Sequence, residues 1–169
     1  MTGGQATAVA VTLCVLVLLY AGMWLGWRAR ARRQADLPPL PAVPAQLGSV
    51  ALDAVEGVYV GTTAAGDWLD RVVVHSLGRR SPAHVEVSAE GVLIERGPEP
   101  ALFLAAGALV DARLDRALGG RVVEPGGLVV LTWQHGARRL DTGIRPRRAT
   151  DAVPLRDAVA RLASRGSAA

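Results

Sequence analysis

The chain has 169 residues, 50% of them hydrophobic, and a net charge of +4. This length suffices for one membrane anchor and one domain of about 100–120 residues. All 19 basic residues are arginine and four of them fall within residues 28–33, so from Val50 onward 15 arginines are balanced by 14 acidic residues. A nearly neutral domain argues against a nucleic-acid partner. The single cysteine, Cys14, excludes an intrachain disulfide and a cysteine-rich metal site.

An uncharged segment near the N-terminus has the length and composition of a membrane span. Residues 6–27 carry no charged side chain. As a helix they would extend about 33 Å, enough to cross a hydrocarbon core of about 30 Å. Tyr20, Trp24 and Trp27 cluster at one end, where aromatic rings favour the membrane interface. The sequence therefore predicts a transmembrane helix over residues 6–27, preceded by a short extracytoplasmic N-terminus of residues 1–5.

A cleaved signal peptide and a buried helix of a soluble domain are the alternatives for this segment. A signal peptide would begin with positive charge and end in small residues. Here residues 1–5 carry no charged side chain, and tryptophans and arginines follow the apolar core. A buried helix would need neighbours over all its faces. We therefore favour a membrane anchor.

Four arginines follow the apolar segment directly, namely Arg28, Arg30, Arg32 and Arg33. Basic residues that flank a span remain on the cytoplasmic side. The basic juxtamembrane segment 28–33 thus predicts a single-pass protein of the cell (inner) membrane, with its N-terminus outside and its domain in the cytoplasm. The arginines also suit a contact with anionic lipid of the bilayer, each contributing about 1 kcal/mol near the surface, although topology alone explains them.

Proline dominates the next segment, residues 34–49. Its four prolines prevent a regular helix and favour a stiff, polyproline-like conformation. We expect a linker that holds the domain off the membrane; a ligand for SH3-type modules is the less favoured interpretation.

Short apolar runs separated by turn residues begin near Val50. Segments such as residues 83–88 alternate apolar and polar side chains, and tight turns such as Ala89-Glu90-Gly91 separate them. This regular spacing is typical of a β-sandwich or barrel. The expected strands are residues 55–63, 69–75, 83–88, 92–96, 102–104, 109–116, 128–133 and 138–144.

The C-terminal segment changes to a helical period. Leu155, Ala158, Val159 and Leu162 recur on one helical face. Thr150 or Asp151 is suited to cap the N-terminus of this helix, and Gly166 is suited to end it. We expect a domain over residues 50–165 and a frayed tail at 166–169.

Five segments carry a resemblance to a known family: RARARR, GVYVGTT, HVEVSAEGVLIERG, LVVLTWQHG and TDAVPLRDAVARL. The order of strands and helix resembles the pleckstrin-homology-like (PH-like) fold, a bent sandwich or barrel of about seven strands capped by a C-terminal helix. The whole chain is similar to short actinobacterial single-pass membrane proteins with a bacterial PH-like domain, and its lack of lysine fits GC-rich coding. Such proteins are often labelled transporters, but a single span cannot by itself form a transport path.

The sequence offers no catalytic pattern. His75, His84 and His135 lie outside any metal-binding motif and are interpreted as surface or strand-end residues, and Trp68 and Trp133 as core or rim packing. No phosphate-binding glycine loop or nucleophile elbow is present. We expect no enzyme, no metal and no cofactor.

One basic cluster remains around the last expected strand. It is either a solvated surface or a site for an anion or a partner, because helix N-termini favour anions. The loop after the first strand carries no basic residue, which weakens a phosphoinositide interpretation. The leading hypothesis is an interaction module or scaffold that binds an unidentified protein or, with less support, a lipid headgroup. The alternative is an accessory subunit of a membrane transport or export complex. The cluster consists of Arg138, Arg139, Arg145, Arg147 and Arg148.

Overall fold

The computed structural model describes residues 3–33 and 37–166. It divides into two compact units, residues 1–36 and 37–169, which we describe separately. The expected tail beyond Gly166 and the first residues of the expected N-terminus lie outside the described residues.

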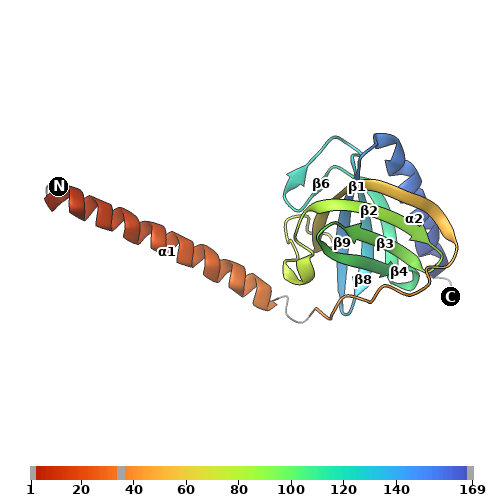
Figure 1. Ribbon diagram of the computed structural model, residues 1–169, viewed down its shortest axis with the longest axis horizontal. Coiled ribbons are helices and arrows are strands. Elements are labelled where there is room, and N and C mark those ends of the chain that lie inside the picture. Colours follow the sequence, from red (N-terminus) through yellow and green to blue (C-terminus); the bar gives the residue numbers. More distant parts are fainter. Residues whose placement is uncertain (1–2, 34–36, 167–169) are drawn as a thin grey trace. The chain divides into compact units, whose positions relative to one another are not determined.

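The first unit is one helix, α1 (Gly3–Arg33), which continues past residue 27 through the basic segment (Figure 1). Its stretch Ala8–Gly26 has a mean hydropathy of 2.3 and none of it is buried, so by length and composition it is able to cross a membrane. Tyr20 and Trp24 are exposed, and the guanidinium of Arg28 lies 5.3 Å from the centroid of the Trp24 ring. The side chains of Trp27, Arg30, Arg32 and Arg33 lie outside the described residues.

The second unit is built on one seven-stranded antiparallel sheet with the order β4-β3-β2-β1-β9-β8-β5. A two-stranded ribbon, β6–β7, and the helix α2 (Ala152–Gly166) complete it. The strands are β1 (Val50–Ala64), β2 (Ser81–Ser88), β3 (Gly91–Arg96), β4 (Glu99–Ala105), β5 (Leu109–Asp115), β6 (Ala117–Leu118), β7 (Arg121–Val122), β8 (Leu128–His135) and β9 (Arg138–Pro146).

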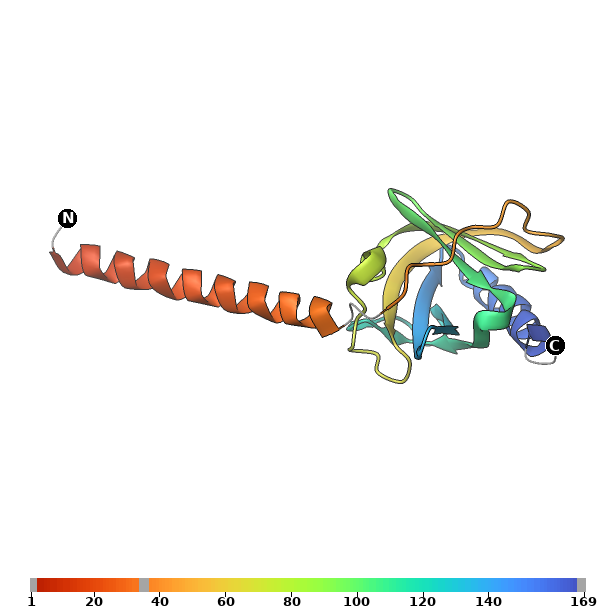
Figure 2. The ribbon, with the colours of Figure 1, turned by 90° about the horizontal axis from the view of Figure 1, so that it is seen from below.

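The long strand β1 holds the two halves of the sheet together. Its first part, up to Tyr59, pairs with β2, and its last part, from Gly57 onward, pairs with β9. The β1–β9 register shifts between Tyr59 and Gly61, and Gly61 has a φ of +145°, a value that favours glycine. The sheet therefore bends at this strand, and the β2–β4 half faces the β8–β9 half (Figures 1 and 2). It stays open between β4 and β5, as a bent sandwich and not as a closed barrel.

The helix α2 covers the β5 side of this opening and confirms the expected C-terminal element. Its apolar stripe is buried, with Leu155 and Val159 fully inaccessible. The 3₁₀ turn Ala149–Asp151 leads into the helix, and the Asp151 carboxylate binds Nε of Arg148 at 3.2 Å and accepts a hydrogen bond from Thr150 Oγ1. The expected cap residues thus lie in the turn before the helix.

One expected strand is wrong. Residues 69–75 form a turn and a 3₁₀ segment, Val74–Ser76, and only Arg71 makes an isolated bridge to β1. The carboxylate of Asp67 accepts hydrogen bonds from the backbone N–H groups of Leu69 (2.9 Å) and Asp70 (3.2 Å). This local turn competes with strand pairing. It leaves Trp68 44% exposed, whereas Trp133 is buried in the core.

The expected linker differs from the structure as well. Leu37 is 5% exposed and belongs to the hydrophobic core, against which Leu40 packs. The carbonyl oxygen of Pro38 accepts a hydrogen bond from Nε2 of His135 (2.9 Å), and that of Leu37 from Nε2 of His75 (3.3 Å). Residues 37–49, here called the strap, therefore belong to the domain, and the boundary expected at residue 50 lies at Leu37. Residues 34–36 lie outside the described residues.

Candidate functional site

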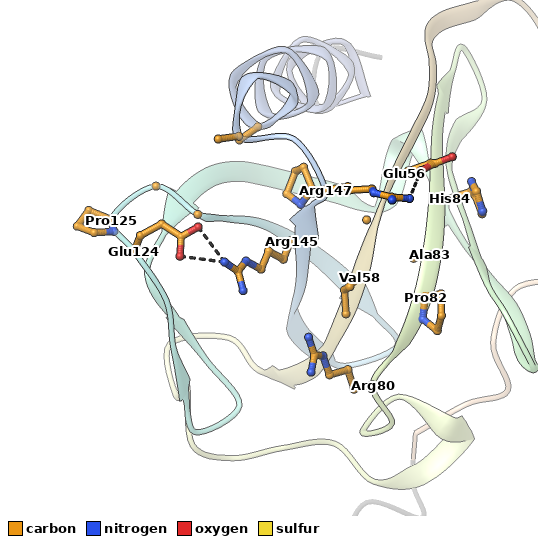
Figure 3. Close-up of a pocket in the computed structure, with 16 residues that line it drawn as sticks. Glu56, Val58, Arg80, Pro82, Ala83, His84, Glu124, Pro125, Arg145 and Arg147 are labelled. Carbon is orange, nitrogen blue, oxygen red and sulfur yellow. Dashed lines mark hydrogen bonds and ion pairs between the residues drawn. The ribbon is translucent and has the colours of Figure 1, made fainter.

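An open groove of about 670 Å³ lies on the outer face of the sheet, where β2, β1 and β9 run side by side (Figure 3). The turn at residues 124–127 and the start of α2 form its rim. We call it the groove. Its ionisable side chains are Arg80, Arg145, Arg147, His84, Glu56 and Glu124.

The floor of the groove follows from strand pairing. Val58 of β1 lies opposite Pro82 of β2 on one side and opposite Arg145 of β9 on the other. Successive side chains of a strand point to opposite faces. Because the next residue, Tyr59, is buried in the core, Val58 faces outward into the groove.

Gly57 allows the strands at the floor to lie this close. A Cβ atom at this position would lie 2.6 Å from the carbonyl oxygen of Arg145. Any larger residue would therefore push β1 and β9 apart beneath the groove.

One wall is a tight turn that presents a carboxylate to an arginine. The N–H of Gly127 donates to the carbonyl oxygen of Glu124 at 2.9 Å, and Gly126 has a φ of +75°, as a type II turn with Pro125 in its second position requires. Nη2 of Arg145 lies 3.0 and 3.1 Å from the two carboxylate oxygens of Glu124. The pKa of Glu124 is lowered, first by a hydrogen bond from its own backbone N–H and then by Arg145.

The other wall carries a second ion pair. Nη1 of Arg147 lies 3.1 Å from Oε2 of Glu56, and the backbone N–H of Arg147 donates to the carbonyl oxygen of Glu56 at 2.8 Å. Both side chains are largely exposed. Solvent-exposed pairs of this kind contribute about 0–1 kcal/mol, so either carboxylate is exchangeable for one from a ligand.

Arg80 differs from the other two arginines of the groove. It is exposed at the beginning of β2, and no residue in the described ranges 3–33 and 37–166 forms an ion pair with it. Figure 3 places its guanidinium at the end of the groove opposite the Glu56–Arg147 pair. The groove therefore offers one uncompensated cation.

The structure separates the basic cluster that the sequence suggested. Arg145 and Arg147 line the groove, whereas Arg138 and Arg139 begin β9 and do not line it. Arg148 is bound to Asp151 beside the groove. Proximity in sequence misled here because arginines at both ends of one strand are separated by its length.

Sequence analysis missed the remaining groove residues. Arg80, Glu56 and Glu124 were not singled out, and His84 was interpreted only as a surface or strand-end residue. Only strand pairing brings these segments together, and the sequence carried no local signal for it. Of the other histidines, His135 ends strand β8, in keeping with the expected surface or strand-end position, but its side chain is buried.

The arrangement is suited to binding a charged ligand. Three guanidinium groups bracket an apolar floor, and two of them already bind a carboxylate. Within the described ranges, no group of three or more histidine, cysteine or acidic residues is positioned to hold a metal ion. The groove therefore fits a ligand that carries negative charge together with apolar groups.

Comparison with known proteins identifies the domain. The sequence model of a family described as "Bacterial PH domain-like" matches residues 37–160. This match begins at the residue where the strap enters the core. No curated protein matches the chain.

Proposed function

Because the chain belongs to the bacterial PH domain-like family, we propose that it is a membrane-anchored interaction module that binds a protein partner at the cytoplasmic face of the membrane. PH-like domains are typically non-catalytic interaction modules. The observation that carries the proposal is the groove, an open site with an uncompensated arginine on an otherwise nearly neutral domain.

Anchoring rests on α1. Its apolar stretch, residues 8–26, is exposed along its whole length, so it needs a partner of its own, and a bilayer supplies one. By the positive-inside rule the arginines from Arg28 to Arg33 support a cytoplasmic domain, and they are suited to an electrostatic contact with anionic lipid.

Photocrosslinking in living cells tests this function. A photoreactive amino acid is introduced into the full chain at Pro82 in the groove, and at exposed Ser164 on α2 as the matched control. We expect a protein adduct from Pro82 that Ser164 does not give. If neither position, nor others around the domain, gives a protein adduct, the proposal is wrong.

The alternative is an accessory subunit of a membrane transport or export complex. Gly22 and Gly26 lie four residues apart on α1, and a Cβ atom at either would meet no neighbour within 4 Å. Such a pair permits close packing against another span. Native gels of the solubilised full chain distinguish the two: a species that contains a second membrane protein and is lost in Gly22→Leu supports the alternative, whereas a monomer opposes it.

A further inference from the structure

We propose that the groove receives an acidic peptide segment of the partner, with Arg80 as its first anchor and with Arg145 and Arg147 released from their own glutamates to bind further carboxylates. This inference rests on the proposed function and assigns the site and the ligand chemistry.

Two of the three arginines in the groove already bind carboxylates, as they would if an acidic peptide were bound. Arg145 and Arg147 each bind a carboxylate from the chain itself, at 3.0 and 3.1 Å. These contacts show which chemical group the arginines accept at this place. Since Arg80 has no such partner among the described residues, an acidic ligand binds there without displacing anything.

The two glutamates also act as competitors. Glu124 is 58% and Glu56 55% exposed at the side chain, so each is able to turn toward water when a ligand carboxylate replaces it. Exchange of one exposed ion pair for another has a small free-energy difference. Removal of Glu124 should therefore strengthen the binding of an acidic ligand, which distinguishes exchange from a fixed structural pair.

The floor determines what lies between the acidic residues. Val58 and Pro82 offer apolar surface between Arg80 and the two ion pairs. A peptide in extended form, with acidic and apolar side chains in turn, matches charged walls and an apolar floor.

A phosphorylated lipid headgroup fits less well. It would bring a dense negative charge close to Glu56 and Glu124 and leave the apolar floor without contacts. A peptide carries its carboxylates at separate positions along the chain, so they can lie near the arginines and away from Glu56 and Glu124. The groove therefore favours a peptide.

A random decapeptide display library is the probe for this site. The full chain is held in phosphatidylcholine nanodiscs, and the recovered peptides are sequenced for wild type, for Arg80→Gln/Arg147→Gln, and for Arg139→Gln/Arg161→Gln. The last variant removes the same charge from exposed positions that do not line the groove. We expect enrichment of Asp and Glu over the input library for wild type and for the control variant, and its loss for the groove variant.

Titration of the most enriched peptide gives the second readout. We expect its Kd to rise about three- to fivefold in Arg80→Gln and to change less than about twofold in Arg139→Gln, in keeping with the loss of one exposed ion pair. Glu124→Gln should lower the Kd, whereas Glu90→Gln, an exposed change in the β2–β3 turn, should not.

Three results would overturn the proposal: no acidic enrichment with wild type, equal losses in the groove and control variants, or binding to phosphatidylserine vesicles that depends on Arg80 while no peptide is recovered. Each leaves the proposed function to be judged by crosslinking. A partner captured from the domain together with a failed selection would mean that the module binds protein, but not through an acidic segment in the groove.

Discussion

Tyr59 shows at the scale of one residue how the core constrains polar groups. It is fully buried, its hydroxyl donates to the carbonyl oxygen of Leu77 at 2.8 Å, and it shares a hydrogen bond with Thr62 Oγ1 at 2.7 Å. Burial raises its pKa from 10.0 to about 12, against smaller opposing effects of Thr62 and of the Arg96 charge. The folded protein therefore holds this phenol in its neutral form.

This shift predicts a stability loss at alkaline pH. A raised pKa contributes stability that is complete below the unfolded value near pH 10 and disappears as the pH rises through about 12. Two pKa units correspond to about 2–3 kcal/mol. Tyr59→Phe should lower the free energy of unfolding by about 1–2 kcal/mol at neutral pH, because the buried hydroxyl's hydrogen bonds to the Leu77 carbonyl oxygen and to Thr62 Oγ1 are lost. The difference in the free energy of unfolding between the unaltered protein and Tyr59→Phe, measured by urea unfolding, should narrow from pH 10 to about pH 12. A difference that stays constant over this range contradicts the raised pKa.

Arg96, at the end of β3, is a buried cation whose guanidinium group is held by backbone carbonyl groups and an aromatic ring. It is 1% exposed, with Nε donating to the carbonyl oxygen of Pro100 (2.8 Å) and Nη1 to that of Ser76 (3.1 Å). Its guanidinium lies 5.0 Å from the centroid of the Tyr59 ring, a cation–π distance. Arg96 therefore donates to two carbonyl groups, one of which, that of Ser76, also accepts from the backbone N–H of Arg79 at 3.2 Å.

Arg96→Ala should lower the free energy of unfolding by about 2–4 kcal/mol, because it leaves a cavity and removes two hydrogen bonds of a buried side chain. Arg96→Met should cost less, since it fills the space while losing the same hydrogen bonds. Urea denaturation of the full chain in detergent measures both. Arg161→Ala is the control, since this arginine is exposed on α2. An equal effect of all three changes contradicts the assignment.

Strand alternation already contained the placement of Arg96. Val92 and Ile94 face the core, and a period of two places Arg96 on the same face. Residues 92–96 are predicted as a strand from the sequence, but the burial of the charged residue at its end, Arg96, was not predicted. By contrast, nothing local predicts the burial of His135, because its acceptor, Pro38, lies 97 residues away in sequence.

At the scale of elements, local chemistry predicted most of the fold. The hairpin of β2 and β3 and the helix α2 follow from alternation, turn residues and helical spacing, and the structure has them within a few residues. The strand predicted at residues 69–75 is wrong, because the hydrogen bonds of Asp67 stabilise a turn there despite the apolar residues. The groove could not be predicted from the sequence, since it depends on how three strands pair.

The strap shows why proline content alone misjudges a segment. Extended conformation suits a spacer, but it equally suits a chain that lies across a core and inserts Leu37. Leu37→Ala should lower the free energy of unfolding by about 2–4 kcal/mol. Val43→Ala, at a strap residue that is 42% exposed, should change it by less than about 0.5 kcal/mol. Hydrogen exchange of β8 and β9 in the full chain reports the loss; identical protection in both variants means that the strap is only a linker.

At the scale of the whole molecule, the two units differ in how much apolar surface they expose. The domain buries its own apolar residues, whereas none of the apolar stretch of α1 is buried. Such a helix is unstable in water on hydrophobic grounds. The proposed bilayer would cover this apolar surface, and the arginines at the end of the helix would then set the direction of insertion.

Topology is therefore the prediction on which the proposed function depends. Arg28, Arg30, Arg32 and Arg33 follow the span and no charged side chain precedes it within the printed sequence. Basic residues determine orientation and acidic ones count little, so Asp36 should not oppose them. A reporter that is active only in the cytoplasm should work when fused after Ala169, and one that is active only outside should not.

Neutral replacements of all four arginines should weaken or scramble this orientation, because neither end of the span then carries a basic side chain. The domain should stay folded, since its core lies entirely within residues 37–163. Arg161→Gln and Arg165→Gln, two charge losses far along the chain, serve as the control and should leave the reporter pattern unchanged. If the C-terminal fusion of the unaltered protein is instead digested by external protease in intact spheroplasts, the domain lies outside the cytoplasm. A cytoplasmic partner for the groove is then impossible.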